Sequence, residues 1–554
     1  MATSSSTLLQ LPAEILTAIP LYLSNRDVKS LRLSCKALHA ISLLRLDRVF
    51  LSANPRNIEV FRAISEHEVL RRQILEIIWD DARLKDEPGS RKSGDPESPN
   101  FDPGFDGLEN MDEDEDYYDD GDGEDEYDDA NEGYPQWFVK ACGKNLQDIK
   151  SHENLDVDRP DHVARAELIA QISLKRSWQY YEQLLQQQRD VLATGSDAEA
   201  FEYGLQRFPA LQRITITPAA HGLLFRPLYE TPMIRAFPPS FNYPNPCSWP
   251  VKKQTQRLWE DTSESEKDTW RGFRIVMRAL AASGAASCDQ QQQKRVVTEI
   301  VVEVNQLLTG LNAHIFDEGC PEQRDLVTIL RRPNFRRLDL ALAVGGLEHY
   351  GWRAFRSGCL RRTLAAAPEL EHASFETDLA DEPDPSYNGL PSGDHHFIPL
   401  RDVLPVDAWT CLRHFGLARF PVRQGDLLSF LAALPATLRS VELSFLFFSD
   451  GNYRDLVADL RDQLGWRGRP AEQRPRVAIG LPDTLGLSRR GIWADRPVEE
   501  FIYHDGLNPF GADGWGVNQI PYGLGGVVKD AFDPAFERPW VDYNELKRLG
   551  YIKA

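Results

Sequence analysis

Residues 335–340 read FRRLDL, with apolar side chains at the first, fourth and sixth positions. The same spacing recurs in frames that begin at Leu46, Ile74, Leu211, Val297, Leu370, Leu412 and Leu438. Successive side chains of a strand point to opposite faces of a sheet, so each frame predicts a short strand with one buried face. A helical pattern over residues 427–434 separates two of these frames. Strands that alternate with helices predict an α/β fold with a parallel sheet and helices on its outer face.

The frames resemble the L-x-x-L-x-L core of leucine-rich repeats. From Val297 onward they begin 38, 35, 42 and 26 residues apart, so the repeat is irregular. The resemblance implies an irregular leucine-rich-repeat-like α/β solenoid, in which each unit packs on its neighbours. We expect residues 51–84 to be the first strand–helix units and residues 136–490 to be the body that binds a substrate.

Two longer segments have a helical apolar pattern, residues 161–192 and residues 264–280. Apolar side chains recur in them at spacings of three and four, for example Trp270, Phe273, Met277 and Leu280. Such a stripe predicts an amphipathic helix that packs on the body rather than a cofactor site.

The segment 8–50 is also helical in pattern and unusually rich in leucine and isoleucine. Pro12 suits the first turn of a helix, where its missing N–H is no loss, and Asp27 is a plausible N-cap for a second helix. A third helix would carry Leu38, Ile41 and Leu44 or Leu46. Pro20 removes one backbone hydrogen bond and should bend the first helix or end it early.

Three helices in about forty residues enclose only a small core, so they cannot bury this many apolar side chains among themselves. One interpretation is that the surplus meets a partner molecule. The alternative is that the helices cap the end of the following domain and bury their apolar face within the same chain.

Leu11-Pro12-x-Glu14-Ile15-Leu16, followed by Ile19, Tyr22-Leu23, Asp27, Leu31-Arg32-Leu33 and Cys35-Lys36, resembles the F-box motif in order and spacing. F-box proteins are substrate receptors of Skp–cullin–F-box ubiquitin ligases, and their three helices bind the Skp adaptor. The resemblance implies that residues 1–50 are an F-box whose partners are the Skp adaptor and, through it, cullin. The implied contact residues are Leu11, Pro12, Ile15, Leu16, Leu23, Leu31, Leu33 and Cys35.

The segments 200–250 and 508–549 are rich in proline, glycine and aromatic residues, and they resemble parts of large filamentous-fungal F-box proteins. This resemblance does not indicate which protein is the substrate. The resemblance implies a non-catalytic adaptor that presents a protein substrate for ubiquitin transfer. A protein-interaction scaffold that uses the same helices without a role in degradation is the alternative.

The net charge is -21, and fifteen acidic and no basic residues lie between Glu109 and Glu132. We expect residues 85–135 to be a disordered acidic linker, because few apolar side chains offset the entropy of ordering it. An acidic chain repels nucleic acids and anionic membranes, and no apolar run reaches the roughly 18 residues of a membrane span. We therefore expect neither partner, and an intracellular location in cytoplasm or nucleus.

The sequence contains no catalytic or phosphate-binding motif, so no catalytic residue, cofactor or metal site is predicted. The best candidates for substrate recognition are Arg331, Arg332, Arg336 and Arg337, because guanidinium groups suit acidic or phosphorylated ligands. Two alternatives are a solvated face paired with nearby acids and a contact with the chain's own acidic tract. Residues 491–554 are a Pro- and Gly-rich C-terminal segment.

Overall fold

The computed structural model describes residues 10–23, 25–42, 44–86, 134–151, 173–222, 227–246, 248–250, 258–285, 297–305, 307–345, 352–379, 397–482 and 491–510. Most of the predicted acidic linker 85–135 and of the C-terminal segment 491–554 lies outside these residues. So does the first part of the predicted helix 161–192. The fold below concerns the described residues alone.

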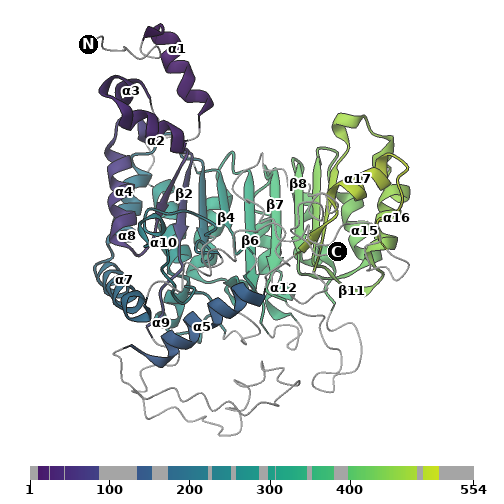
Figure 1. Cartoon of the computed structure of the whole chain (residues 1–554). Helices are drawn as coiled ribbons and strands as arrows, with labels where there is room; N and C mark the ends of the chain where they lie inside the picture. The colour runs from purple at the N-terminus through teal and green to yellow at the C-terminus, as the bar shows by residue number, and fades with distance from the viewer. Residues whose placement is uncertain are drawn as a thin grey trace, which may run out of the picture.

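One sheet of eleven strands organises the chain (Figure 1). Its main path follows the order of the sequence, and all neighbours on that path are parallel except the last pair. The path runs through β1 (Arg48–Leu51), β2 (Glu76–Asp80), β3 (Arg213–Thr217), β4 (Glu299–Val302), β6 (Arg337–Ala343), β7 (His372–Thr377), β8 (His414–Ala418), β10 (Ser440–Ser444), β12 (Arg476–Pro482) and β13 (Gly491–Trp493). The short β5 (Leu311–Asn312) pairs with β6, while β9 (Pro421–Arg423) and β11 (Phe447–Asp450) form a separate parallel pair.

The eight predicted frames coincide with eight of these strands and lie in one register. Their fourth residues are paired from strand to strand, and they are Val49, Ile77, Ile214, Ile300, Leu338, Ala373, Phe415 and Val441. All eight are buried in one hydrophobic core. The predicted α/β fold with parallel strands is therefore confirmed.

A ninth parallel strand, β12, was not predicted. Its inward-facing Val477 and Ile479 continue the register of Val441 and Leu443. The first position of its frame is Arg474, and this single polar residue hides the pattern in the sequence.

Helices cover the face of the sheet that carries Val49 and Leu51, which we call the helix face. In Figure 1, α4 (Pro55–Glu66) and α8 (Ser196–Leu205) lie at one end of the sheet and α15 (Gln424–Ala433), α16 (Tyr453–Gln463) and α17 (Asp495–Tyr503) at the other. The remaining covering helices include α10 (Arg271–Ala285), α11 (Pro321–Leu330), α12 (Arg353–Arg356), α13 (Cys359–Leu364) and α14 (Leu400–Val403). The helix predicted over 427–434 is α15.

The predicted helix 264–280 is divided into three pieces. They are α9 (Glu264–Lys267), a 3-10 turn (Asp268–Trp270) and α10. Trp270, Phe273, Met277 and Leu280 are buried in the main core, which confirms that this stripe packs on the body. The second long helix is α7 (Leu174–Thr194), which packs with α5 (Gln136–Ser151) in a separate aromatic core around Phe138 and Tyr181.

The opposite face of the sheet, which we call the second face, carries Arg48 and Phe50. Over β2 and β4 it is covered by Ala220 and Tyr229, which form a small core with Ile78 and Val301. Over β7, β10 and β12 the second face carries small or polar side chains that stay partly exposed, such as Ser374, Glu442 and Ala478.

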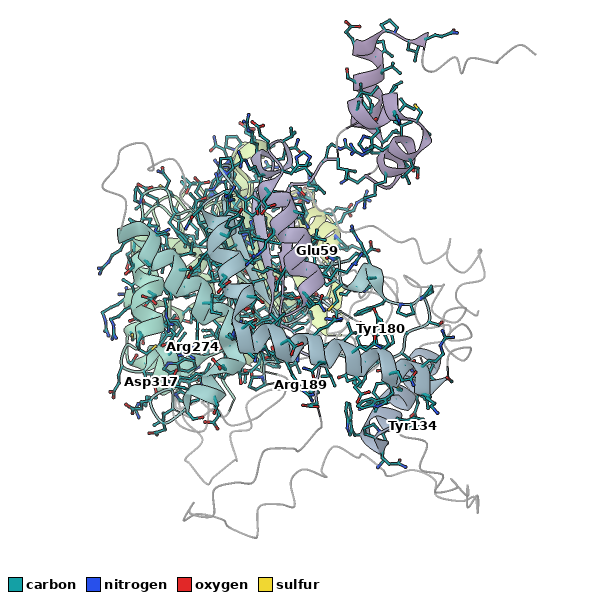
Figure 2. The ribbon with its side chains drawn as sticks, turned by 90° about the vertical axis from the view of Figure 1, so that its left-hand side faces the viewer. Glu59, Tyr134, Tyr180, Arg189, Arg274 and Asp317 are labelled. Carbon is teal, nitrogen blue, oxygen red and sulfur yellow. The ribbon has the colours of Figure 1, made fainter. Side chains whose placement is uncertain are left out.

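The N-terminal helices stand clear of this body, at the top of Figures 1 and 2. They are α1 (Ala13–Ala18), the 3-10 turn η2 (Ile19–Tyr22), α2 (Asn25–Ser34) and α3 (Lys36–Ile41). The first helix changes to a 3-10 turn at Ile19, one residue before Pro20, as the proline predicts. The prediction that Asp27 caps the second helix is wrong, because α2 begins at Asn25 and Asp27 lies within its first turn.

Candidate functional site

The three N-terminal helices bury few of their own side chains. Among the described residues of these helices, the buried aliphatic side chains are Val28 and Leu38. The exposed fractions of their large apolar side chains are 38% for Leu11, 49% for Ile15, 89% for Tyr22 and 87% for Leu33. The other residues that the structure describes leave these four side chains exposed, so burial by that part of the chain, as in an internal end-cap, does not account for them.

The remaining predicted contact residues are less exposed. Leu16, Leu23, Leu31 and Cys35 are half-buried, whereas Pro12 is exposed. Cys35 has an internal role, because its sulfur accepts a hydrogen bond from the Leu38 backbone N–H at 3.5 Å and so caps α3. We call Leu11, Ile15, Tyr22 and Leu33 the exposed apolar set. Tyr22 was missed as a candidate, although the quoted motif contains it.

The helix group is tied to the chain that leaves it. Asn25 donates from its side-chain nitrogen to the Arg45 carbonyl at 2.6 Å and accepts from the Arg45 N–H at 3.0 Å. These two bonds join the start of α2 to the segment that enters β1. The exposed apolar set is therefore presented by a closed group of helices rather than by a loose end.

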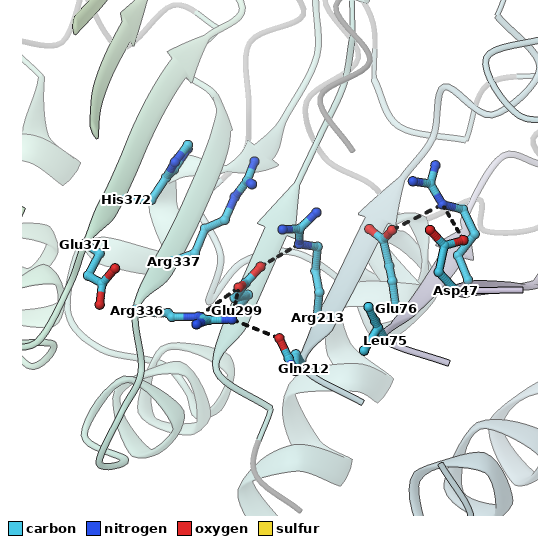
Figure 3. Close-up of a pocket in the computed structure, with 11 residues that line it drawn as sticks. Asp47, Leu75, Glu76, Gln212, Arg213, Glu299, Arg336, Arg337, Glu371 and His372 are labelled. Carbon is cyan, nitrogen blue, oxygen red and sulfur yellow. Dashed lines mark hydrogen bonds and ion pairs between the residues drawn. The ribbon is translucent and has the colours of Figure 1, made fainter. Parts of the chain in front are cut away.

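A second candidate lies where the strands begin, on the second face. The third residue of each frame forms a row across the sheet, paired strand to strand. The row reads Arg48, Glu76, Arg213, Glu299, Arg337, His372, His414 and Ser440. Its first part lines a depression of about 530 Å³ (Figure 3).

Opposite charges alternate along the first part of this row. Arg213 donates to Glu299 at 2.6 Å, and Glu299 also accepts from Arg336 at 2.9 Å. Glu76 accepts from Thr215 at 2.6 Å and lies 3.6 Å from Arg48. Burial raises the pKa of Glu76, an effect that the Thr215 hydrogen bond and the Arg48 charge reduce. The depression carries an internally paired set of charges.

The row continues through a buried ion pair to two histidines. Arg337 lies 2.6 Å from Asp339, and Asp339 lies 3.0 Å from the His372 ring. Burial alone would raise the pKa of Asp339, but Arg337 and His372 together outweigh it and hold that pKa well below its usual value. His414 stacks on His372 with ring centroids 4.1 Å apart and bonds Ser440 at 2.9 Å.

This chain of contacts does not form a catalytic triad. Asp339 contacts His372, whereas Ser440 contacts His414, and the two rings meet face to face at an interplanar angle of 16°. In a catalytic triad, the serine hydroxyl and the carboxylate bond opposite nitrogens of one imidazole ring, which acts as the base. Here the carboxylate and the hydroxyl contact two different rings.

The four arginines proposed for substrate recognition do not form one cluster. Arg336 and Arg337 line the depression and are paired with Glu299 and Asp339. Arg332 instead donates to the Leu280 carbonyl at the end of α10, and burial lowers its pKa. Arg331 lies exposed just beyond α11.

Sequence reasoning missed the alternating row, although the signal was present. Once the eight frames are aligned, their third residues read Arg, Glu, Arg, Glu, Arg, His, His, Ser. This order becomes a row of contacts between opposite charges only when consecutive frames form neighbouring strands of the sheet.

Two buried carboxyl groups at the end of β2, Asp80 and Asp81, were also missed. Asp81 accepts from the Trp249 ring N–H at 2.9 Å and from the Gly272 N–H at 3.2 Å, which ties β2 to α10. Asp80 accepts from the Ala82 N–H at 3.0 Å, while its Oδ2 atom is buried and has no hydrogen-bond partner among the described residues. Burial raises the pKa of Asp80 to about 8.

Metal and membrane features were also sought in the part of the chain that the structure describes. Among those residues, no group of three or more His, Cys, Asp or Glu side chains is arranged to hold a metal ion. None of their helices combines the length and apolar character needed to cross a membrane. The sequence matches no protein-family model, and no curated protein matches it.

Proposed function

We propose that this chain is a non-catalytic substrate-recognition adaptor of a Skp–cullin–F-box ubiquitin ligase. Residues 1–50 would be the F-box and would bind the Skp adaptor and, through it, cullin. The body would bind a protein substrate, and the ligase complex would act in the cytoplasm or nucleus. Neither a nucleic acid nor a membrane is part of the proposal.

The observation that carries this proposal is the exposed apolar set. Fully covering an aliphatic or aromatic side chain gains about 1.5–3 kcal/mol, so covering several of them gains on the order of 10 kcal/mol. That is comparable with the free-energy cost of association. The order and spacing of the F-box resemblance supports the Skp adaptor as the molecule that covers them.

The body supports the second part of the proposal. Its parallel strands follow the chain order, and its frames share one register, which is the arrangement expected of an irregular leucine-rich-repeat-like solenoid. An adaptor of this kind contributes proximity: it raises the local concentration of the target lysines and supplies no acid or base of its own.

A pull-down with a purified Skp-family adaptor tests the proposal on the full-length chain. The wild type should bind, and the Leu11→Asp, Ile15→Asp double variant should lose at least 10-fold in affinity, because two carboxylates would have to be desolvated at the interface. Leu507→Asp is the matched control, since Leu507 is an exposed leucine (76%) of the body. It should bind as the wild type does.

Two outcomes would contradict the proposal. If the wild type does not bind the adaptor, the ubiquitin-ligase function is lost. If it binds the adaptor but no cullin joins the complex, the non-degradative scaffold replaces it.

A further inference from the structure

A pocket of about 560 Å³ lies in the helix layer, apart from the residues proposed above to bind the Skp adaptor or the substrate. One side of it comes from the segment 258–278, which includes α9 and half of α10, and the other from the segment 314–322, which leads into α11. We call it the α10 pocket. Figure 2 labels Arg274 and Asp317, one from each side. Its volume is in the range of pockets that bind small molecules.

The inner cations of the pocket already have partners. The Arg274 side chain is 13% exposed and lies 2.6 Å from Glu264 and 3.0 Å from Glu322. Arg274 also contacts Asp268 at 3.4 Å, and Lys267 lies 3.3 Å from Glu264. An anion that entered the pocket would compete with these carboxylates for the same two cations. This side of the pocket is therefore not arranged for an anionic ligand.

The opposite side has a buried carboxylate that uses only part of its capacity to accept hydrogen bonds. The Asp317 side chain is 9% exposed, and its Oδ2 atom lies 2.8 Å from the His314 ring and 3.8 Å from Arg353. Its Oδ1 atom is buried and has no hydrogen-bond partner among the residues that the structure describes. A buried acceptor without a donor costs free energy. A ligand that brings a donor to Asp317 would remove that cost.

The charge of the whole lining is also unbalanced. Glu318 and Glu260 are exposed; Glu318 pairs with Arg353 at 2.9 Å, whereas Glu260 forms no ion pair with the described residues. Apart from His314, the lining has five carboxylates against three cations, which are Lys267, Arg274 and Arg278. A surplus of one sign of charge in a hollow with walls of low dielectric constant raises the local concentration of the opposite charge. The α10 pocket should therefore attract a cation.

Trp259 supplies an apolar wall of the pocket. Its ring N–H donates to Glu322 at 3.1 Å, which fixes the orientation of the ring. The Lys267 ammonium lies over this ring, 5.5 Å from its centroid, so the chain itself packs an aliphatic ammonium group on the indole face. Leu258 and Pro321 belong to the same lining. Apolar side chains of this kind pack against the methylene groups that precede an ammonium group.

We propose that the α10 pocket binds an aliphatic ammonium group, supplied by a free diamine or by the lysine side chain of a protein. An ammonium group has three N–H donors and no acceptor, which suits a wall with a carboxylate oxygen that lacks a donor. Its charge matches the surplus of acidic residues, and its methylene chain matches Trp259, Leu258 and Pro321. The proposal does not depend on the Skp adaptor, because none of the residues proposed for that contact lines the pocket.

The test is calorimetric titration of the full-length chain with 1,5-diaminopentane and with 1,5-pentanediol, which has the same length and no charge. The diamine should bind at least about 10-fold more tightly, because it forms charged hydrogen bonds that the diol cannot form. Asp317→Asn should lose most of this preference. Nα-acetyl-lysine methylamide is the third ligand: tighter binding than the diamine would assign the ammonium group to a protein lysine, and weaker binding would assign it to a free amine.

A second variant keeps the test decisive if Asp317→Asn does not fold. Glu260→Gln, Glu318→Gln changes two exposed side chains of the pocket and should reduce the preference about threefold. Glu202→Gln, Glu472→Gln is the matched control, because it removes two exposed carboxylates that do not line the pocket, and it should keep the preference.

Two results would overturn the proposal. In one, the wild type binds the diamine no more tightly than the diol, or binds neither of them. In the other, the preference for the diamine survives unchanged in the variants of the pocket. The Leu11→Asp, Ile15→Asp variant should bind the diamine as the wild type does, so failure here and failure of the Skp-adaptor proposal are distinguishable.

Discussion

The N-terminal helices and the sheet use similar aliphatic side chains with opposite results. Leu443 in the sheet is fully buried, whereas Leu33 in α2 is 87% exposed. A strand inside a parallel sheet has a neighbour on each side and helices above it, so every apolar position on one face is covered. Three short helices that stand clear of the body have no such cover. The apolar residues of the sheet hold the fold, and those of the helices are available to another molecule.

Phe415→Ala should produce the largest loss of stability and tests the sheet side of this comparison. Phe415 is fully buried on β8, in the middle of the sheet, and its ring lies 5.0 Å from that of Phe430 on α15. Removing a buried phenyl ring leaves a cavity, so the free energy of unfolding should fall by about 3–5 kcal/mol. Urea denaturation followed by circular dichroism measures it. A loss below about 1 kcal/mol would mean that Phe415 is not part of a tightly packed core.

Asp80→Asn should give a pH-dependent gain in stability, because burial separates the pKa of this carboxyl from its ordinary value near 3.8. With a folded-state pKa of about 8, the folded chain keeps a proton that the unfolded chain releases near pH 4. The wild-type free energy of unfolding should therefore fall as the pH rises through this window, by up to about 1.4 kcal/mol per pH unit.

The Asp80→Asn variant has no proton to lose at this position. It should match the wild type near pH 4 and exceed its stability progressively up to about pH 8. Urea denaturation of both proteins at pH 5, 6, 7 and 8 measures the difference between them, and other titrating groups cancel in it. A difference that does not change with pH would show that Asp80 is ionised in the folded chain.

The same contrast explains which features the sequence could predict. Spacing along one strand is local information, so frames such as 335–340 and 438–443 identified their strands and their buried face. Contacts between strands depend on which strands become neighbours, and the Arg213–Glu299 pair joins residues far apart in the sequence. The buried carboxyl Asp81 was missed for the same reason, since its partners Trp249 and Gly272 come from distant segments.

The N-terminal helices were predictable to a different degree. The surplus of leucine and isoleucine over what three helices can enclose was visible in the sequence, and Pro20 marked the end of the first helix. The exact caps were not, because Asn25 bonds to Arg45 across the group and Cys35 caps α3 through its sulfur. The four arginines 331, 332, 336 and 337 are near one another in sequence, yet a helix end and a strand start send them to different surroundings.

Leu33→Ser should produce the smallest change in stability and tests the helix side of the comparison. Because the side chain is already in water, its loss removes little buried area, and surface substitutions of this kind change the free energy of unfolding by less than about 0.5 kcal/mol. The same substitution should weaken binding to the Skp-family adaptor, since a side chain covered at an interface contributes about 1.5–3 kcal/mol, a factor of roughly 10 to 150 in affinity. Urea denaturation and calorimetric titration of one protein preparation measure both quantities. A fall in the free energy of unfolding of 2 kcal/mol or more with an unchanged affinity would mean instead that Leu33 is buried within the chain in solution. The contrast between apolar residues that hold the fold and apolar residues that bind a partner would then fail at Leu33.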